Sequence, residues 1–184
     1  MAWQQNRMDS RILDFYSGRT ADDQGRMWSQ IVAWPDDQLE EIHDFIQWLF
    51  PLPERSQANP LAPVIDRTDI EAFRASPELQ ERLRTSFRRM LGFYGLKFQE
   101  TETPDVVRAP GFELRARNWL TLNNHNHLRI TRILRSLRLF GLDVEAKALY
   151  SCLSAIYEEE VHRGEARIAP RTWQFWVAAA FGDL

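Results

Sequence analysis

Two consecutive helix patterns between His125 and Val161 constrain the fold most, because they are the longest and most regular patterns in the chain. Gly141 and Asp143 lie in the turn that joins them. Gly141 fits a left-handed C-terminal cap, and Asp143 fits the N-cap of the following helix. This stretch is therefore predicted to form a helical hairpin around which the rest of the chain packs.

The two helices of the hairpin differ in how much of their surface is apolar. In the first helix, apolar residues share one side at about 100° per residue and arginines take the rest. The arginines are Arg129, Arg132, Arg135 and Arg138. Apolar residues cover well over half of the second helix, so it is expected to be the enclosed, central one. Leu134 in the first helix and Leu153 in the second are predicted to be buried.

A chain of 184 residues with 44% hydrophobic content can form one domain that buries roughly 70% of its unfolded surface. We predict an all-α fold, a single compact multi-helix domain spanning residues 1–184. The sequence shows no signal-peptide core, and its longest apolar run, Phe175 to Phe181, is shorter than the about 18 residues of a membrane span. With Cys152 as the single cysteine, a cytoplasmic protein without a membrane partner is expected.

Proline and glycine divide the remainder of the chain. A continuous amphipathic helix is expected from Asp36 or Asp37 to Phe50, followed by a proline-rich loop from Pro51 to Pro63. Ser76 and Gly95 fit the two ends of a longer helix. Residues 96 to 110 suggest a short β-hairpin.

Seven tryptophans and eleven phenylalanines are more aromatic residues than a core usually holds. Large core side chains account for most of them, but some are expected to line a groove. Trp48 lies opposite the main apolar stripe of its helix, so one face of its ring is expected to be free to stack on a ligand. Trp48, Phe50 and Asn59, at and beside the proline-rich loop, are therefore candidate binding residues.

The net charge of −3 conceals two segments of opposite sign. Residues 21 to 54 hold eight acidic side chains against Arg26 alone, a local charge of −7, whereas residues 76 to 140 hold twelve basic and six acidic side chains, a local charge of +6. The two segments can pair with each other, the outcome we favour, or leave a basic surface for nucleic acid or another anion. Arg82, Arg129 and Arg132 are the candidate residues of that surface.

Two Glu-x-x-His patterns, at Glu40 and His43 and at Glu159 and His162, resemble half of the ligand set of a di-iron helical bundle. The other carboxylates of such a set are missing, so no metal is expected, and a metalloenzyme is the least favoured alternative.

The sequence His125-Asn126-His127 stands at a helix start, where Asn124 or Asn126 can cap free N–H groups and His125 can bond a neighbouring helix. Asn124 and His125 complete the candidate binding residues.

Signals for catalysis are weak. The sequence contains no Gly-x-Ser-x-Gly motif, phosphate-binding glycine loop or dinucleotide fingerprint, and Cys152 lies on an apolar helix face without a basic partner. A non-enzymatic protein without catalytic residues or a cofactor is therefore expected.

Several motifs occur together in a characteristic order. They are Asp44-Phe-Ile-Gln-Trp-Leu-Phe-Pro51, Asn59-Pro-Leu-Ala-Pro63, Ser76-Pro-Glu-Leu-Gln-Glu-Arg-Leu83, Phe93-Tyr-Gly95 and His125-Asn-His-Leu-Arg-Ile-Thr-Arg-Ile-Leu134. With these motifs the chain resembles the conserved domain of the opioid growth factor receptor family over roughly residues 10 to 160.

The resemblance implies an all-helical domain and, for animal members, binding of an enkephalin-type peptide and a nuclear role in restraining growth. The chain is expected to be a minimal bacterial version without the C-terminal repeats of the animal members. The resemblance supplies no catalytic residues. We interpret the chain as a non-catalytic interaction module for a peptide or protein segment, with an anion or nucleic-acid binder as the alternative.

Overall fold

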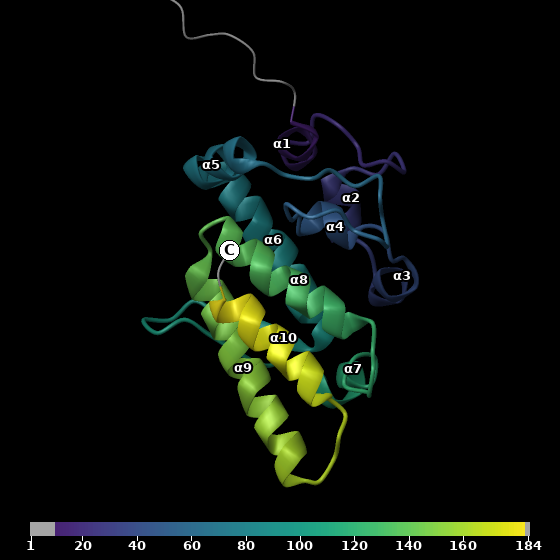
Figure 1. Cartoon of the computed structure of the whole chain (residues 1–184), viewed down its shortest axis with the longest axis vertical. Coiled ribbons are helices and arrows are strands. Elements are labelled where there is room, and N and C mark those ends of the chain that lie inside the picture. The colour runs from purple at the N-terminus through teal and green to yellow at the C-terminus, as the bar shows by residue number, and fades with distance from the viewer. Residues whose placement is uncertain (1–9, 183–184) are drawn as a thin grey trace, which may run out of the picture.

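The computed structural model describes residues 10–182, which are mostly helical and include one two-stranded antiparallel sheet (Figure 1). The elements are α1 (Arg11–Tyr16), α2 (Trp28–Val32), α3 (Asp36–Glu41), α4 (Ile46–Leu49), α5 (Arg67–Ala75), α6 (Pro77–Tyr94), β1 (Leu96–Gln99), β2 (Asp105–Arg108), α7 (Phe112–Ala116), α8 (Asn126–Leu139), α9 (Asp143–His162) and α10 (Pro170–Phe181). The strands confirm the predicted β-hairpin, with Leu96 opposite Arg108. The all-α prediction therefore needs this small sheet added to it.

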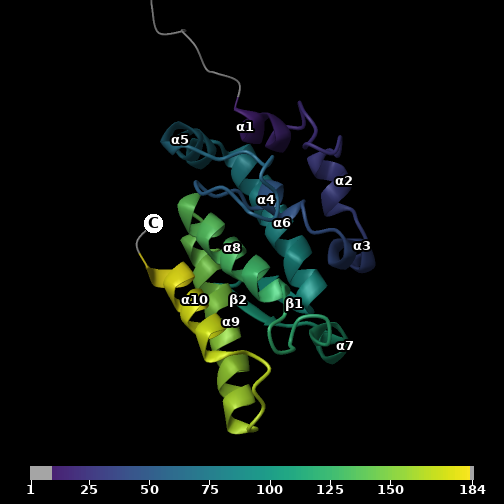
Figure 2. The same ribbon diagram turned by 45° about the vertical axis from the view of Figure 1, so that its right-hand side comes forward.

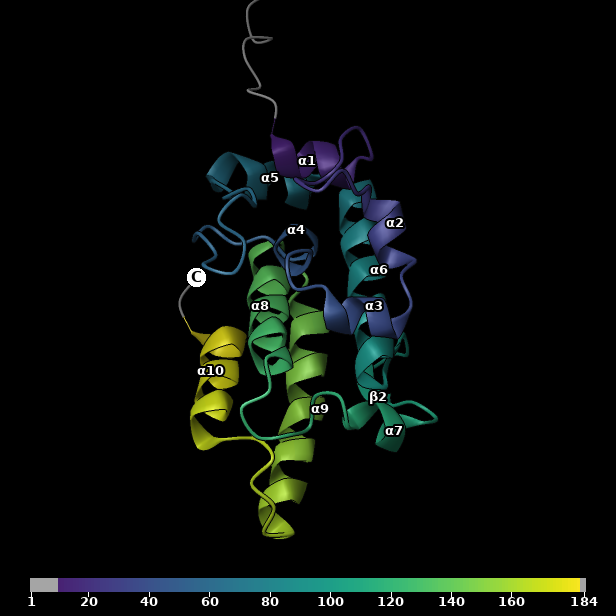
Figure 3. The same ribbon diagram turned by 90° about the vertical axis from the view of Figure 1, so that its right-hand side faces the viewer.

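The helices form layers on either side of α8. Figure 2 shows α8 between α10 and α6, and Figure 3 shows α2 and α3 on the outer side of α6 with α1 and α5 across one end. The buried apolar side chains of these elements form one cluster that includes residues from α1 through α10. Among residues 10–182, no helix combines the length and apolarity that crossing a bilayer requires.

Local signals set the ends of α6. Ser76 caps its start, because the Ser76 hydroxyl accepts a hydrogen bond from the Leu79 N–H at 3.4 Å. Gly95 ends it in the left-handed conformation, with φ +76°. A Cβ at Gly95 would also lie 3.0 Å from the Phe112 Cα, so the position requires glycine for space as well as for conformation. Both predicted ends are confirmed.

The turn between α8 and α9 also follows its sequence signals closely. Gly141 adopts the predicted left-handed conformation with φ +82°. Asp143 is the first residue of α9 rather than its cap. Its negative charge is still stabilised there by the positive end of the helix dipole. Leu134 and Leu153 are both fully buried, as predicted.

The more enclosed helix of the hairpin is α8, not α9 as expected. Nine of the fourteen residues of α8 are buried, against seven of the twenty in α9. The end of α9 projects beyond the other helices (Figures 1 and 3), which leaves its last turns partly covered. The apolar pattern of α9 includes small residues that stay partly exposed, so the pattern spans a wider part of the helix than the buried face does.

The predicted continuous helix from Asp36 to Phe50 is wrong, because the chain is extended at Ile42, with φ −90° and ψ 130°. The Arg129 guanidinium donates hydrogen bonds to the carbonyl oxygens of Leu39 and Ile42, each at 2.8 Å. In a continuous helix these oxygens would accept bonds from N–H groups of the next turn. A side chain from α8 therefore replaces the helical bonds and separates α3 from α4.

Other arginines also donate to carbonyl groups at helix ends. Arg82 donates to the Tyr16 carbonyl at the end of α1, and Arg132 donates to the Phe50 carbonyl after α4 at 3.0 Å. Arg138 donates to the Ala179 and Gly182 carbonyls at the end of α10. A cation at a helix C-terminus satisfies free carbonyls and the negative end of the dipole. The arginines of α8 thus hold neighbouring helices in place.

The predicted basic face of α8 is consequently wrong for Arg129, whose residue surface is only 5% exposed. The predicted pairing of the acidic and basic segments is confirmed in part. Arg89 lies 2.7 Å from Asp36, and Arg135 lies 2.5 Å from Glu54. Pairing and carbonyl capping together remove most of the exposed charge that a basic surface would need.

Candidate functional site

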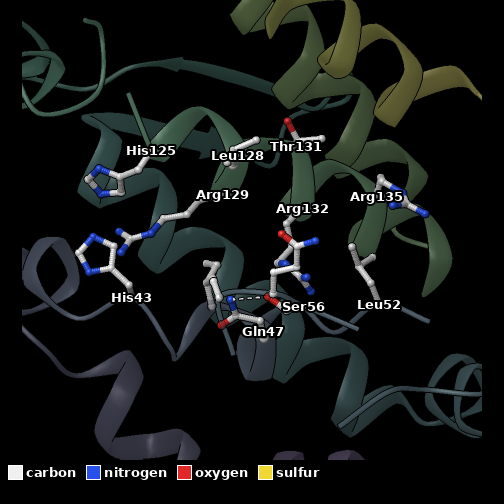
Figure 4. A pocket seen from close by; sticks show the side chains of 13 residues that line it. His43, Gln47, Leu52, Ser56, His125, Leu128, Arg129, Thr131, Arg132 and Arg135 are labelled. Carbon is white, nitrogen blue, oxygen red and sulfur yellow. Dashed lines mark hydrogen bonds between the residues drawn. The ribbon is translucent and has the colours of Figure 1, made fainter. Parts of the chain in front are cut away.

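A cavity of about 520 Å³ lies between α4, the loop that follows it, and α8. Figure 4 shows His43 and His125 at one end of this cavity and Leu52 and Arg135 at the other. Its lining includes three arginines and two histidines but no aspartate or glutamate. Apolar walls with a few convergent polar groups are typical of ligand sites. We call this space the α4–α8 cavity.

Gln47 places an unpaired acceptor at the wall of the α4–α8 cavity. Its residue surface is 4% exposed, and its Nε2 donates to the Ser56 hydroxyl at 3.1 Å, but its Oε1 accepts no hydrogen bond from the described residues. Leaving a buried acceptor unpaired costs about 1–3 kcal/mol. A ligand N–H at this position would remove that cost.

The two histidines lie close together, with ring centroids 4.8 Å apart. His125 Nε2 lies 3.5 Å from the Glu40 carboxylate and forms no hydrogen bond within residues 10–182. Burial, and then the charge of Arg129, lowers the pKa of His125 below its usual value. The His125 imidazole is therefore favoured in its neutral form at pH 7.

The three arginines of the cavity differ in their partners. The Arg129 guanidinium donates hydrogen bonds to the carbonyl oxygens of Leu39 and Ile42, and Arg135 pairs with Glu54. Arg132 makes a single hydrogen bond, to Phe50, and has no carboxylate within 4.0 Å among the described residues. Burial lowers the pKa of the Arg132 guanidinium to about 10, so the group remains charged at pH 7. Arg132 is thus a desolvated cation without a direct counter-ion in the described chain.

Three of the predicted binding residues, His125, Arg129 and Arg132, come together at the α4–α8 cavity. Trp48 and Phe50 do not line it, because both are buried in the core. The Trp48 Nε1 donates to Asp23 at 3.0 Å, and the Arg11 guanidinium covers its ring at 5.0 Å. The expectation of a free face on the Trp48 ring is therefore wrong.

The remaining candidates hold structure near the cavity or away from it. Asn59 shapes the proline-rich loop, because its Oδ1 accepts from Leu61 and its Nδ2 donates to the Asp44 carbonyl at 2.8 Å. Asn124 caps the start of α8 as expected, through a 2.9 Å bond from the Asn126 N–H. Arg82 belongs to α6, and its guanidinium donates to the Tyr16 carbonyl at the end of α1. The structure does not bring these three side chains into the cavity.

Sequence reasoning missed Gln47, Ser56 and Leu128 as lining residues. Gln47 is the single polar residue in the apolar run from Phe45 to Phe50, a signal that could have identified it. Leu128 is 68% exposed beside the cavity, although its position on the arginine-bearing side of α8 gave no reason to select it.

The surroundings of the Glu-x-x-His residues and of Cys152 bear on whether they could bind a metal ion or act as a nucleophile. Within residues 10–182, no group of three or more His, Cys, Asp or Glu side chains is placed to hold a metal ion. His43 lies outside the helix on which the Glu-x-x-His pattern expected it, because α3 ends at Glu41. Burial raises the pKa of the Cys152 thiol to about 11, which keeps the thiol protonated at pH 7.

His127 provides a pH-dependent contribution to stability near this site. Its Nε2 bonds the Trp119 carbonyl at 2.9 Å, and its buried Nδ1 has no partner in the described chain. Burial lowers the pKa of folded His127 below the ordinary value of 6.5, so the unfolded chain binds the proton more readily. The contribution is therefore present above pH 6.5 and is lost as the pH falls through the folded pKa.

We expect His127→Gln to reduce the loss of unfolding free energy between about pH 7.5 and 5.5. Urea denaturation at both pH values measures this loss. The unaltered chain, measured at the same two pH values, is the reference. An equal loss in His127→Gln and the unaltered chain would contradict the assignment.

Comparison with known proteins places these features in a family context. A family described as "Opioid growth factor receptor (OGFr) conserved region" matches residues 5–179. The chain is similar to the opioid growth factor receptors of Mus musculus and Homo sapiens, with 46% and 45% identity over 112 residues, which is 60% of this chain and 17% and 16% of theirs. Opioid growth factor receptor-like protein 1 of Xenopus tropicalis is 38% identical over 112 residues, 60% of this chain and 21% of that protein. The matched part thus spans about a fifth of these relatives. No solved structure matches the chain.

Proposed function

Because the chain belongs to the opioid growth factor receptor conserved-region family, we propose that it is a non-catalytic module that binds a short peptide or protein segment in the α4–α8 cavity. Relatives named as receptors support a ligand-binding role for the family. The ligand of the present chain is inferred from the chemistry of the cavity. An enkephalin-type peptide is the first probe that the family suggests.

The buried, unpaired Oε1 of Gln47 carries this proposal. A peptide supplies a backbone N–H at nearly every residue, and one such group would complete the hydrogen bonding of Gln47. The volume of about 520 Å³ lies within the roughly 300–1,000 Å³ of ligand pockets. Leu52 and Leu128 provide apolar contact for side chains of the segment.

The walls of the cavity are held in place before a ligand arrives. Arg129 fixes the end of α3, Arg132 fixes the end of α4, and Asn59 fixes the loop. A wall ordered in advance reduces the entropy that binding must overcome. These contacts therefore support a binding site more than a gap between loosely packed helices.

The same contacts weaken the nucleic-acid alternative. A duplex-binding surface needs several exposed cations aligned with phosphates. On α8 the guanidiniums of Arg129, Arg132 and Arg138 donate to backbone carbonyls, and that of Arg135 pairs with Glu54. A peptide that enters the cavity needs only one of them.

Binding of short peptides tests the proposal. One set of random pentapeptide sequences is made in two forms, one pool with free-acid C-termini and one with amide C-termini. Both pools and an enkephalin-type peptide are titrated against the chain. Saturable binding in either pool is expected, and individual binders are then measured by isothermal titration calorimetry. Absence of saturable binding in both pools and by the enkephalin-type peptide would contradict the proposal.

Gln47→Leu is expected to weaken the selected peptides about tenfold, because one hydrogen bond in a buried site is lost. The unfolding free energy should change by less than about 1 kcal/mol, since the mutation also removes an unpaired buried acceptor. Gln80→Leu is the matched control. The Gln80 amide donates a 2.6 Å hydrogen bond to the Phe140 carbonyl, and Gln80 does not line the cavity. This control should reduce stability without reducing affinity, and equal affinity of Gln47→Leu and the unaltered chain would refute the role of Gln47.

A further inference from the structure

The charges around the α4–α8 cavity are unbalanced. Arg129, Arg132 and Arg135 line it, while Glu40 and Glu54, the carboxylates paired with its lining side chains, lie outside the lining. The three guanidiniums and these two carboxylates together carry a net charge of +1. Partly buried charges are screened less by salt than exposed ones. A negatively charged group in the cavity would restore the balance.

We propose that the cavity takes the C-terminal carboxylate of its peptide ligand and that Arg132 binds this carboxylate. The inference rests on the proposed peptide-binding function and adds the end of the chain that is recognised. The ligand is therefore a short peptide with a free carboxyl terminus, oriented with that terminus at Arg132 and a backbone N–H at Gln47.

Arg132 is the arginine with donors to spare. A guanidinium carries five N–H donors in a planar fork that matches a carboxylate. Within the described residues, Arg132 uses only Nη1, toward the Phe50 carbonyl, so Nε and Nη2 donate no hydrogen bond. Arg129 is buried against three oxygen atoms, and Arg135 is already paired with Glu54. The bond to Phe50 also fixes the orientation of the Arg132 fork.

The size of the cavity favours a chain end over an internal acidic residue. A volume of about 520 Å³ is that of a small-ligand pocket, so only a few residues of a peptide fit inside. An internal glutamate would need the chain to enter and leave again, whereas a terminus needs one entry. The desolvation of Arg132 also strengthens a charge-assisted hydrogen bond to a carboxylate.

The free-acid and amide forms of one selected pentapeptide provide the direct test. The free acid should bind at least about tenfold more tightly, because the amide loses a charge-assisted contact with a desolvated guanidinium. A third peptide carries an amide terminus and a glutamate as its last residue, which moves the carboxylate to a side chain. It should bind like the plain amide.

Arg132→Gln should abolish the preference for the free acid. Arg138→Gln is the matched control, because Arg138 lies on the same helix, also donates to carbonyl groups at a helix end, and does not line the cavity. It should keep the full preference. The comparison of acid with amide on the unaltered chain stands even if Arg132→Gln is poorly folded.

Every outcome other than those expected above contradicts the inference, in one of four ways. Equal binding of acid and amide would refute carboxylate recognition while leaving the proposed peptide binding intact. Equal binding of the free acid and the glutamate-bearing amide would refute recognition of the terminus. A full preference in folded Arg132→Gln would refute the role of Arg132. Failure of all forms to bind would refute the proposed function and the inference together.

Discussion

Arg129→Met is expected to lower the free energy of unfolding by about 2–5 kcal/mol, because two carbonyl oxygens lose their donor in a buried site. These are the oxygens of Leu39 and Ile42, at the point where α3 ends. The guanidinium also lies 5.3 Å from the Phe45 ring, so its loss removes a cation–π contact. Methionine keeps much of the side-chain length, which limits the cavity left behind.

Chemical denaturation of Arg129→Met measures this loss, and Arg135→Met on the same helix is the control. Arg135 is half-buried and forms one ion pair with Glu54. Its replacement should cost less than about 1 kcal/mol, as is usual for pairs open to solvent. Equal losses in the two variants would show that Arg129 does not hold α3.

Leu134→Ala and Leu153→Ala are each expected to cost about 2–5 kcal/mol, the range of large-to-small changes in a closely packed core. Both side chains are fully buried at the contact of α8 with its neighbours. A cavity opened there cannot be filled by movement of one element alone, because α8 is covered on several sides. The loss should therefore lie well above that of a surface change.

Leu128→Ala provides the control on the same helix, since Leu128 is 68% exposed. It should change the unfolding free energy by at most about 0.5 kcal/mol. Urea titrations of the three variants separate the buried face of α8 from its open face. Losses below about 1 kcal/mol for both Leu134→Ala and Leu153→Ala would mean that the buried face is assigned wrongly.

The elements that could be predicted are those whose ends depend on nearby residues. Ser76 and Gly95 set the ends of α6, and Gly141 sets the turn between α8 and α9, through contacts within a few residues. The β-hairpin between α6 and α7 follows from two short apolar segments separated by a polar turn.

The elements that could not be predicted depend on contacts between distant segments. Ile42 is extended because Arg129, 87 residues further along, takes the carbonyl oxygen that a helical N–H would otherwise bond. Trp48 is buried because Asp23 and Arg11 cover it from the N-terminal part of the described chain. Periodicity describes one helix at a time and contains neither contact.

The candidate site was predictable only in part for the same reason. The arginines of α8 and the loop after α4 were both identified, but the cavity forms where they face each other. Gln47 was not selected from the sequence, and in the structure the short α4 places it at the cavity wall beside α8. Once α3 and α4 separate, the polar residue in the apolar run becomes the wall of a cavity.

The central claim is that the α4–α8 cavity is the ligand site, and side-chain ¹H–¹⁵N NMR spectra test it most directly. A selected free-acid pentapeptide is titrated into the labelled chain while the Gln47 amide and the Arg132 and Arg138 Nε–Hε signals are followed. We predict saturable shifts for Gln47 and Arg132 with no shift for Arg138. Saturable shifts confined to α9 and α10, with Gln47 and Arg132 unchanged, would contradict the claim.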